Sequence, residues 1–544
     1  MYHYLLNNDS FQLRSIFLPG GSGNYYRPLL IVSYMMDKYI WGLEESFMHL
    51  ENIVFHLINT LLVFLIARSA SKVFCLRSLT VPFVSALLFA LHPINTEAVN
   101  WISGRTDLLA GIFIFSAVFL LVRKTANSLA SLCAAVCLFL ACLAKETAVF
   151  FLPAAILLPF YLYSGRDSDL KFSQVILKHI QHFIYFISSG VGYFALRNLA
   201  YNQGDQGVQR VFSHVAGEAS AGSLTSLWMV LKASGFYLKK LLIPFPLNFG
   251  IIHVSDLYIV VGVMTWFLFV WILFKRTVPG YFFLCSASIG GSAFLIPLLK
   301  LAWTPLAERY MYMPSAFFLI GVTLAVSDMK NRERFQPVLV GLTGIVLITA
   351  TFGTASRNLL WQNNLALFQD TLNKSPEFLP ARNEIANALN AQGRNQEAIN
   401  VLKSIEIPQN ISNSQIGLIS KSGALAQEGN IGGARSLLYK ALESPGKYEK
   451  QIVERLLALY DYEVMNHKVE VNHTFAERER LLIRLFKITG DFFYQYRLGQ
   501  LYLQVGDRVK ARNSFQQVVA CTSEKVYFYQ PSEKLVKKLI MQGN

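Results

Sequence analysis

The stretch VPFVSALLFALHPINTEAVNWISGRTDLLAGIFIFSAVFLLV, residues 81–122, holds two apolar runs on either side of a polar loop. The runs at 81–92 and 108–122 are almost free of charge, which is typical of helices in lipid. An ordinary connector needs only turn residues and solubility, yet this loop collects carboxylates, a cation and an imidazole. The stretch therefore predicts paired membrane helices with a site at the membrane boundary.

The composition supports a membrane protein. Of the 544 residues, 53% are hydrophobic and only 15% are charged, against about 25% charged in a typical soluble domain. The mean hydropathy of +0.37 excludes a simple cytosolic domain. The net charge of +15 suits anionic lipid headgroups, so we expect membrane lipids as partners and no nucleic acid. The six cysteines show no metal-ligand spacing and no disulfide framework.

Ten apolar runs predict about ten spans within a membrane domain at 1–356, followed by a soluble helical domain at 357–544. The runs lie at 47–68, 81–92, 108–122, 128–144, 147–163, 180–198, 257–275, 280–298, 313–327 and 337–355. Basic residues mark the loops expected on the cytoplasmic face. They are Arg68, Lys72, Arg77, Arg123, Lys124, Arg166, Lys171, Lys178, Lys275, Arg276, Lys330, Arg332 and Arg334.

If successive spans cross the membrane in alternate directions and the basic loops share one face, the position of two further segments is constrained. The stretch 220–246 must not change sides, so we expect a helix lying in the outer interface or a pair of re-entrant segments. The first 46 residues and the C-terminal domain then both lie outside. Because MYHYLLNNDSFQLRSIF is neither a signal peptide nor a span, we expect a first helix to be missing.

The C-terminal half contains a degenerate repeat. ANALNAQGRNQEAINVL (386–402) matches GALAQEGNIGGARSLL (423–438), and a further copy is LGQLYLQVGDRVKARNSF (498–515). Their glycines recur at about the 34-residue period of tetratricopeptide repeats, which are pairs of helices joined by a turn. We therefore expect a tetratricopeptide-type α-solenoid that offers a concave binding surface and no chemistry.

Four outer segments hold the candidate site residues. They are YYRP with Arg27; HPINTEAVNWISGRTDLL with His92, Asn95, Glu97, Asn100, Arg105 and Asp107; LAKE with Lys145 and Glu146; and KLAWTPLAERYMYMPS with Glu308, Arg309 and Tyr310. Arginine suits bidentate contact with phosphate.

Simpler interpretations remain open for several of these residues. Asp107 suits a capping role in the first turn of a helix better than a catalytic role, although it could also form an ion pair with Arg105. Lys145 and Glu146 could form a solvated turn, and Tyr310 could belong to an aromatic belt.

A polar stripe runs along the first span. His49, Asn52, His56 and Asn59 step by three, four and three positions, so they share one helix face. Such a stripe faces either hydrogen-bond partners inside the bundle or a wet cavity.

The sequence has no Walker A, Rossmann, HExxH or GxSxG motif, so ATP-driven and nicotinamide chemistry are unsupported. A transporter remains possible, but the charges gather in outer loops rather than midway along broken helices. This placement favours a lipid-linked anionic substrate.

The motifs resemble those of a known family. YYRPLLIVSYMMDKYIWGL, HPINTEAVNWISGRTDLL, LAKE and PLAERYMYMPS, followed by the repeats, look like the transmembrane-and-tetratricopeptide (TMTC-like) proteins of the GT-C glycosyltransferase superfamily. The resemblance implies an all-α polytopic membrane helix bundle followed by the solenoid. It also implies an O-mannosyltransferase-like enzyme that uses a polyprenyl-phosphate-linked sugar at the lumenal or periplasmic face. The repeats would then present a protein acceptor.

One departure concerns catalysis. The family carries an acidic pair in its first outer loop, and here Met1 stands immediately beyond that place, so the catalytic base is not visible. Glu97 is the nearest substitute. As a hypothesis, cations of the outer loops stabilise the departing lipid phosphate, with Arg309 as the first choice, Lys145 and Arg105 behind it, and Arg27 also in the donor site. The supporting residues are His92, Asn95, Asp107, Glu146, Glu308, Tyr310 and His56.

Other expectations follow from the resemblance. A divalent metal often assists GT-C enzymes, but no ligand set can be argued here. Arg309→Ala should abolish transfer and leave expression intact. The placement would be the bacterial inner membrane, or the endoplasmic reticulum in a eukaryote. The alternatives are a non-catalytic scaffold that recruits envelope proteins through its repeats and a lipid-linked polysaccharide transferase.

Overall fold

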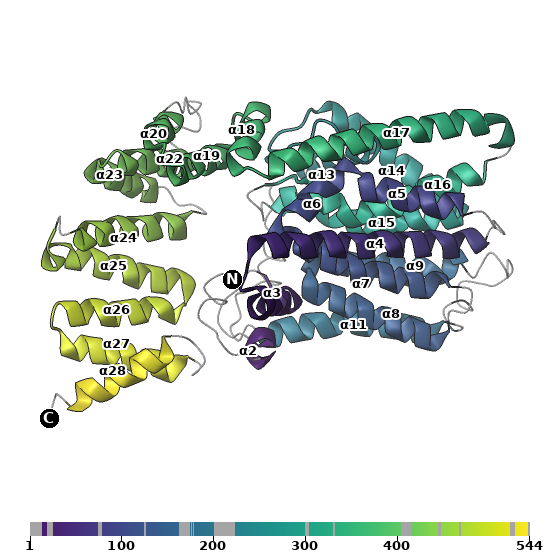
Figure 1. The fold of residues 1–544 in the computed structure, drawn as a ribbon. Helices are drawn as coiled ribbons and strands as arrows, with labels where there is room; N and C mark the ends of the chain where they lie inside the picture. Colours follow the sequence, from purple (N-terminus) through teal and green to yellow (C-terminus); the bar gives the residue numbers. More distant parts are fainter. Residues whose placement is uncertain are drawn as a thin grey trace. The chain divides into compact units, whose positions relative to one another are not determined.

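The structure is a computed structural model. It describes residues 13–18, 25–73, 79–123, 127–162, 175, 177, 179–200, 223–299, 304–329, 332–403, 415–443, 448–466, 469–522 and 528–541. These residues form helices and connecting turns, and an isolated bridge joins Ile251 to Leu306. The all-α prediction is therefore confirmed (Figure 1).

The chain forms two compact units. The first contains Asn24–Leu199 and Gly207–Ser375, and the second contains Pro376–Asn544 with Met1–Gly23 and Ala200–Gln206. The division at residue 376 falls later than the predicted 357, because α17 (Arg332–Trp361) packs against α18 (Asn364–Lys374) within the first unit.

Each of the ten predicted apolar runs coincides with a helix of the first unit. These helices are α4 (Glu45–Val73), α5 (Thr80–Leu91), α7 (Arg105–Val122), α8 (Ser128–Ala144), α9 (Leu152–Leu162), α11 (Ile180–Ala200), α14 (Leu257–Lys275), α15 (Val278–Leu299), α16 (Tyr312–Ser327) and α17. Among the described helices of this unit, α3 (Pro28–Trp41), α6 (Thr96–Asn100), α13 (Ser223–Leu242) and α18 lie outside the runs.

Among the residues that the structure describes, five helical segments are long and apolar enough to cross a membrane. They are Glu45–Lys72, Ile102–Val122, Leu257–Lys275, Glu308–Ser327 and Arg334–Trp361. Shorter apolar helices accompany them, at Thr80–Leu91, Ser128–Ala144, Glu146–Tyr161 and Val278–Phe294. The chain is a multi-pass membrane protein.

Helix α13 lies antiparallel along α14. Gly235 of α13 contacts the backbone of Tyr258, and Gly262 of α14 contacts the backbone of Leu231, so neither position has room for a side chain. A helix alongside an apolar span does not lie flat in the interface, so that expectation for 220–246 was wrong. The re-entrant alternative stays a prediction.

Some expectations fall on residues that the structure does not describe. These are the N-terminal stretch up to Gln12 and the loop residues Arg77, Lys124, Arg166, Lys171, Lys178, Lys300 and Lys330.

The second unit is a series of helices, and tight turns form several of the connections that the structure describes. Its described helices from Pro376 onward are α19 (Leu379–Ala391), α20 (Asn395–Lys403), α22 (Gln415–Gln427), α23 (Ile431–Leu442), α24 (Glu449–Met465), α25 (Val471–Thr489), α26 (Phe492–Gln504), α27 (Arg508–Cys521) and α28 (Tyr529–Met541). The three predicted turn glycines, Gly393, Gly429 and Gly506, have φ values of 76°, 81° and 81°. This left-handed conformation explains the glycine in each copy.

Candidate functional site

Short helical turns cap the membrane helices where the predicted site residues gather. They are η1 (Pro93–Asn95), α6 (Thr96–Asn100), η2 (Ile102–Gly104), η3 (Glu146–Phe151) and η4 (Glu308–Met311). All of them belong to the first unit. They place five acidic and basic pairs close to the ends of the apolar helices.

The first pair joins Glu97 of α6 to Arg309 of η4. The Arg309 backbone N–H donates to Glu97 Oε2 at 3.1 Å, and its guanidinium donates to Oε1. The guanidinium also donates to Thr304 Oγ1 at 3.0 Å and to the Tyr310 hydroxyl at 3.2 Å. It lies 4.8 Å from the ring centres of both Trp101 and Tyr310. Arg309 is thus held on several sides at once.

The second pair joins Lys145 to Asp107 of α7, with Nζ 2.5 Å from Oδ1. Both side chains are buried, so the solvated turn proposed for Lys145 is wrong. The pKa of Lys145 is lowered, mainly by burial and also by the positive charges of Arg27 and Arg309. The Asp107 carboxylate opposes this shift.

The third pair joins Arg27 to Glu146 of η3. Arg27 donates from Nε and a terminal nitrogen to the two carboxylate oxygens, at 2.8 and 2.6 Å. This bidentate contact has about one-fifth of each side chain exposed to solvent, more than in the two pairs above. We call Glu97–Arg309, Asp107–Lys145 and Arg27–Glu146 the three-pair cluster.

Arg105 lies at a separate centre. It is fully buried, and its guanidinium contacts Asp37 of α3 at 2.5 Å and Glu51 of α4 at 3.0 Å. It also donates to the Asn52 side chain at 3.2 Å and to the Met48 carbonyl at 3.1 Å. The pairing of Arg105 with Asp107, one of the alternatives that the sequence left open, is therefore wrong.

Glu308 faces α13 and the proline-rich segment after it. Its Oε1 accepts from Lys240 Nζ at 2.6 Å and from the Asn248 N–H at 3.0 Å. Lys240 also donates to the carbonyls of Pro244, at 3.0 Å, and Pro246. The other oxygen, Oε2, is buried and has no hydrogen-bond partner among the described residues.

The polar stripe of α4 faces the bundle interior. His56 bonds to the Tyr312 hydroxyl at 2.9 Å and to the Ala90 carbonyl at 3.2 Å. Asn59 donates to the same hydroxyl at 3.1 Å and to the Leu108 carbonyl at 2.9 Å. These contacts are the interhelical hydrogen bonds that one of the two interpretations required.

His92 and Asn95 position the loop that carries Glu97. His92 Nε2 lies 3.1 Å from the Leu241 carbonyl, and His92 Nδ1 accepts from the Ile94 N–H at 3.3 Å, which together assign the neutral tautomer. Burial lowers the pKa of His92 to about 4. Asn95 donates to the Phe89 carbonyl at 2.8 Å. Both residues therefore hold the backbone of the loop.

A divalent metal does not fit these residues. Among the described residues, no group of three or more His, Cys, Asp or Glu side chains could hold a metal ion. The carboxylates of the three-pair cluster already accept from arginine or lysine donors.

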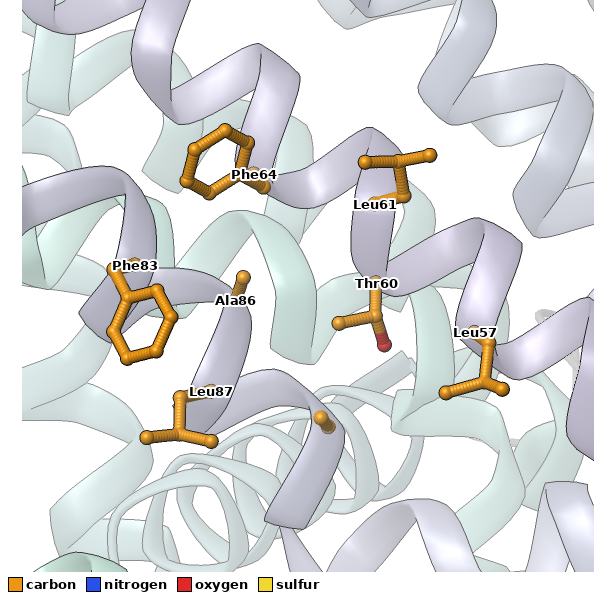
Figure 2. Close-up of a pocket in the computed structure, with 8 residues that line it drawn as sticks. Leu57, Thr60, Leu61, Phe64, Phe83, Ala86 and Leu87 are labelled. Atoms are coloured by element: carbon orange, nitrogen blue, oxygen red, sulfur yellow. The ribbon is translucent and has the colours of Figure 1, made fainter. Parts of the chain in front are cut away.

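An apolar hollow of about 490 Å³ opens between α4 and α5. Figure 2 shows its walls, which contain a single hydroxyl, that of Thr60. That hydroxyl donates to the His56 carbonyl. The lining residues are Leu57, Thr60, Leu61, Phe64, Phe83, Ala86, Leu87 and Ala90.

Curated proteins with similar sequences share one description. The human protein O-mannosyl-transferase TMTC1 is 26% identical over 434 residues, covering 69% of this chain and 47% of that protein. Mouse protein O-mannosyl-transferase TMTC3 is 24% identical over 550 residues, covering 90% of this chain and 56% of that protein. The Caenorhabditis elegans protein O-mannosyl-transferase F38B6.6 is 23% identical over 385 residues, covering 69% of this chain and 52% of that protein. The chain is TMTC-like.

This TMTC-like chain spans about half the length of the curated relatives it matches. No family model matches the chain. No solved structure matches it either.

Three charged residues of the TMTC-like site were missed from the sequence. Asp37 and Glu51 bind Arg105, and Lys240 binds Glu308. Asp37 carried a usable signal, because a lone carboxylate within an apolar helix is costly unless it is paired. Lys240 carried none, since a lysine on a helix with two other lysines looks solvated.

Proposed function

We propose that this TMTC-like chain is an integral-membrane glycosyltransferase that moves a mannose-like sugar from a polyprenyl-phosphate donor to a Ser/Thr hydroxyl of a protein. Relatives described as protein O-mannosyl-transferases support the reaction class. The observation that carries the proposal is the three-pair cluster, where three cations gather at the ends of apolar helices. Such a place suits a substrate with an anionic head and an apolar tail.

The proposed mechanism assigns the departing phosphate to the cluster. Arg309 offers donors held in place by Glu97, Thr304 and the aromatic rings, so little reorganisation is needed as charge develops. Lys145 and Arg27 lie close enough to influence each other's charge and would add to this stabilisation. Arg105 is fully enclosed by its two carboxylates, so it is the least suited of the four cations.

The proton acceptor is a separate question. Glu97 was predicted as the substitute base, and that role stays a prediction. Both of its oxygens accept hydrogen bonds from Arg309, so the carboxylate is already engaged. The apolar hollow beside α4 would receive the lipid chain of the donor, and the repeats would present the acceptor protein at the lumenal or periplasmic face.

The test uses the full chain reconstituted in lipid, a polyprenyl-phosphate mannose and peptides rich in Ser and Thr. Mass spectrometry should detect peptides heavier by one hexose. Lys145→Gln should abolish this product, whereas Lys232→Gln should retain it, because Lys232 lies in an exposed pair on α13. Peptide binding without hexose transfer by the unaltered protein would favour the scaffold instead, and hexose transfer to a glycan would favour the polysaccharide transferase.

A further inference from the structure

Helix α3 buries its carboxylate and exposes large apolar side chains. Asp37 is buried, and it lies 2.5 Å from the Arg105 guanidinium. Met36, Tyr39 and Ile40 are three and four positions apart, so they share one face of the helix, and they are 51%, 55% and 57% exposed. A helix at a water-covered surface usually turns its polar residues outward. The exposed face of α3 therefore suits an apolar medium better than water.

The exposed face of α3 continues onto the first turns of α4. The Trp41 ring stacks on the Phe47 ring, with the ring centres 4.5 Å apart, and the Trp41 indole donates to Glu51 Oε1 at 2.7 Å. Leu50, one turn after Phe47, is 53% exposed. The stacked rings thus join the exposed faces of the two helices. We call this surface the corner patch, and its residues are Met36, Tyr39, Ile40, Trp41, Phe47 and Leu50.

The corner patch continues into the surface of a membrane span. The exposed large apolar residues that follow Leu50 on α4 are Ile53, Val54, Leu57, Ile58 and Leu61. They belong to the segment Glu45–Lys72, whose 28 residues are apolar enough to cross a membrane. At about 1.5 Å per residue this helix exceeds the roughly 30 Å apolar core of a bilayer. Its ends, including the first turns within the corner patch, therefore extend into the headgroup region.

The direction of α3 and the side chains of the corner patch fit the headgroup region. Figure 1 shows α3 almost end-on beside the beginning of α4, whereas α4 runs across the view. Helix α3 thus lies across the end of the span, and its 14 residues are too few to cross a bilayer. Tyr and Trp, which both occur in the corner patch, are enriched at membrane–water interfaces because each combines an apolar ring with a polar group.

A buried ion-pair triad fixes α3 in this position. The Arg105 guanidinium contacts Asp37 of α3 at 2.5 Å and Glu51 of α4 at 3.0 Å. The Tyr34 hydroxyl of α3 also donates to the Ile102 carbonyl at 3.1 Å. Helix α3 could turn its apolar face inward only by separating these charges, and breaking a buried ion pair is strongly destabilising. The corner patch is therefore a fixed part of the protein surface.

We propose that the corner patch is embedded in the lipid interface, in the leaflet on the side of the three-pair cluster, and anchors α3 to the membrane. Its continuity with the exposed apolar surface of α4 identifies lipid as the partner. This inference goes beyond the proposed function and does not depend on it. Arg27 directly precedes α3 as its N-cap residue, so the anchor also fixes the depth of its guanidinium relative to the lipid phosphates.

The experiment compares the oxidation of two methionines in the full chain, reconstituted at one copy per lipid nanodisc. Met36 is 51% exposed and Met465, in the second unit, is 78% exposed, so the protein itself shields neither side chain. A water-soluble oxidant should modify Met36 at least about tenfold more slowly than Met465, because an apolar side chain of this size prefers an apolar phase over water by about that factor. Mass spectrometry of peptides measures the added oxygen. In the denatured chain the two rates should agree.

Two results of this experiment would overturn the inference. Equal oxidation rates in nanodiscs would show that the corner patch faces water. Protection of Met36 only in discs that hold two copies would assign the patch to a contact between copies of the chain.

A second measurement uses Trp41. Lipids brominated near the headgroup should quench the part of the tryptophan fluorescence that Trp41→Phe removes, and this variant keeps a ring that can stack on Phe47. A Trp41 signal that these lipids leave unquenched would also contradict the anchor. Neither measurement depends on sugar transfer, so an inactive protein would contradict the proposed function and leave this test intact.

Discussion

Neutralising either member of the Glu97–Arg309 pair should destabilise the protein more than neutralising both. Glu97 is 2% exposed and Arg309 is 8% exposed, so Arg309→Gln leaves a buried carboxylate without its counter-charge. Removing one partner of a buried ion pair costs about 3–5 kcal/mol. The double variant Glu97→Gln/Arg309→Gln leaves neither charge alone, and two amides can hydrogen-bond to each other. We expect an interaction free energy of about 2–3 kcal/mol between the two positions, near the upper end for residues in contact.

The assay is unfolding in mixed micelles, followed by tryptophan fluorescence, because Trp101 lies against the Arg309 guanidinium. The four proteins of the cycle are compared at one detergent composition. Arg394→Gln, in an exposed pair of the second unit, is the control and should cause no resolvable change. If the two single losses add to the double loss within about 0.5 kcal/mol, the pair is not coupled. The cost to stability also means that Arg309→Ala should reduce expression as well as transfer.

Three further predictions concern packing, pH and the proline-rich segment. Gly262→Val should lower the free energy of unfolding by about 1–3 kcal/mol or more, because Gly262 touches the Leu231 backbone. Gly341 lies in open space, so the control Gly341→Val should change this free energy far less. His92 has a pKa of about 4 against an ordinary 6.5, so the unfolded chain takes up its proton first. Stability should therefore fall as the pH drops from about 6.5 to 4, and less so in His92→Gln. Lys240→Met removes the donor to two proline carbonyls, so hydrogen exchange at 244–250 should increase.

Much of the fold follows from hydropathy alone. An apolar run must hydrogen-bond its own backbone in lipid, and helices do so within a single segment. This is why each of the ten runs is a helix. Helix α13 was misjudged because its lysines suggested an interfacial helix. Lys240 is instead buried and contacts Glu308 and the carbonyls of Pro244 and Pro246. Glu308 lies 68 positions away along the chain, so this partner cannot be identified from local composition.

Most residues of the site could be predicted from the sequence, but not which of them form ion pairs with each other. The sequence left a pairing of Arg105 with Asp107 open because the two residues are close neighbours in the loop. Both lie in the first turn of α7, where residues two positions apart do not face each other. Asp107 therefore reaches Lys145, and Arg105 reaches Asp37 on another helix. Which residues pair depends on helix rotation and packing, neither of which the sequence pattern specifies.

The pairing also constrains how an anionic donor could bind. The three-pair cluster is formally neutral, so a phosphate entering it must compete with a carboxylate for each cation. The cost of opening a pair rises with its burial, because an enclosed carboxylate cannot regain water. Arg27–Glu146 has about one-fifth of each side chain exposed, while Lys145–Asp107 and Arg309–Glu97 are below one-tenth. On the proposed function, Arg27 is therefore the cation that exchanges its carboxylate for phosphate at least cost, and the two enclosed pairs act as fixed charges behind it.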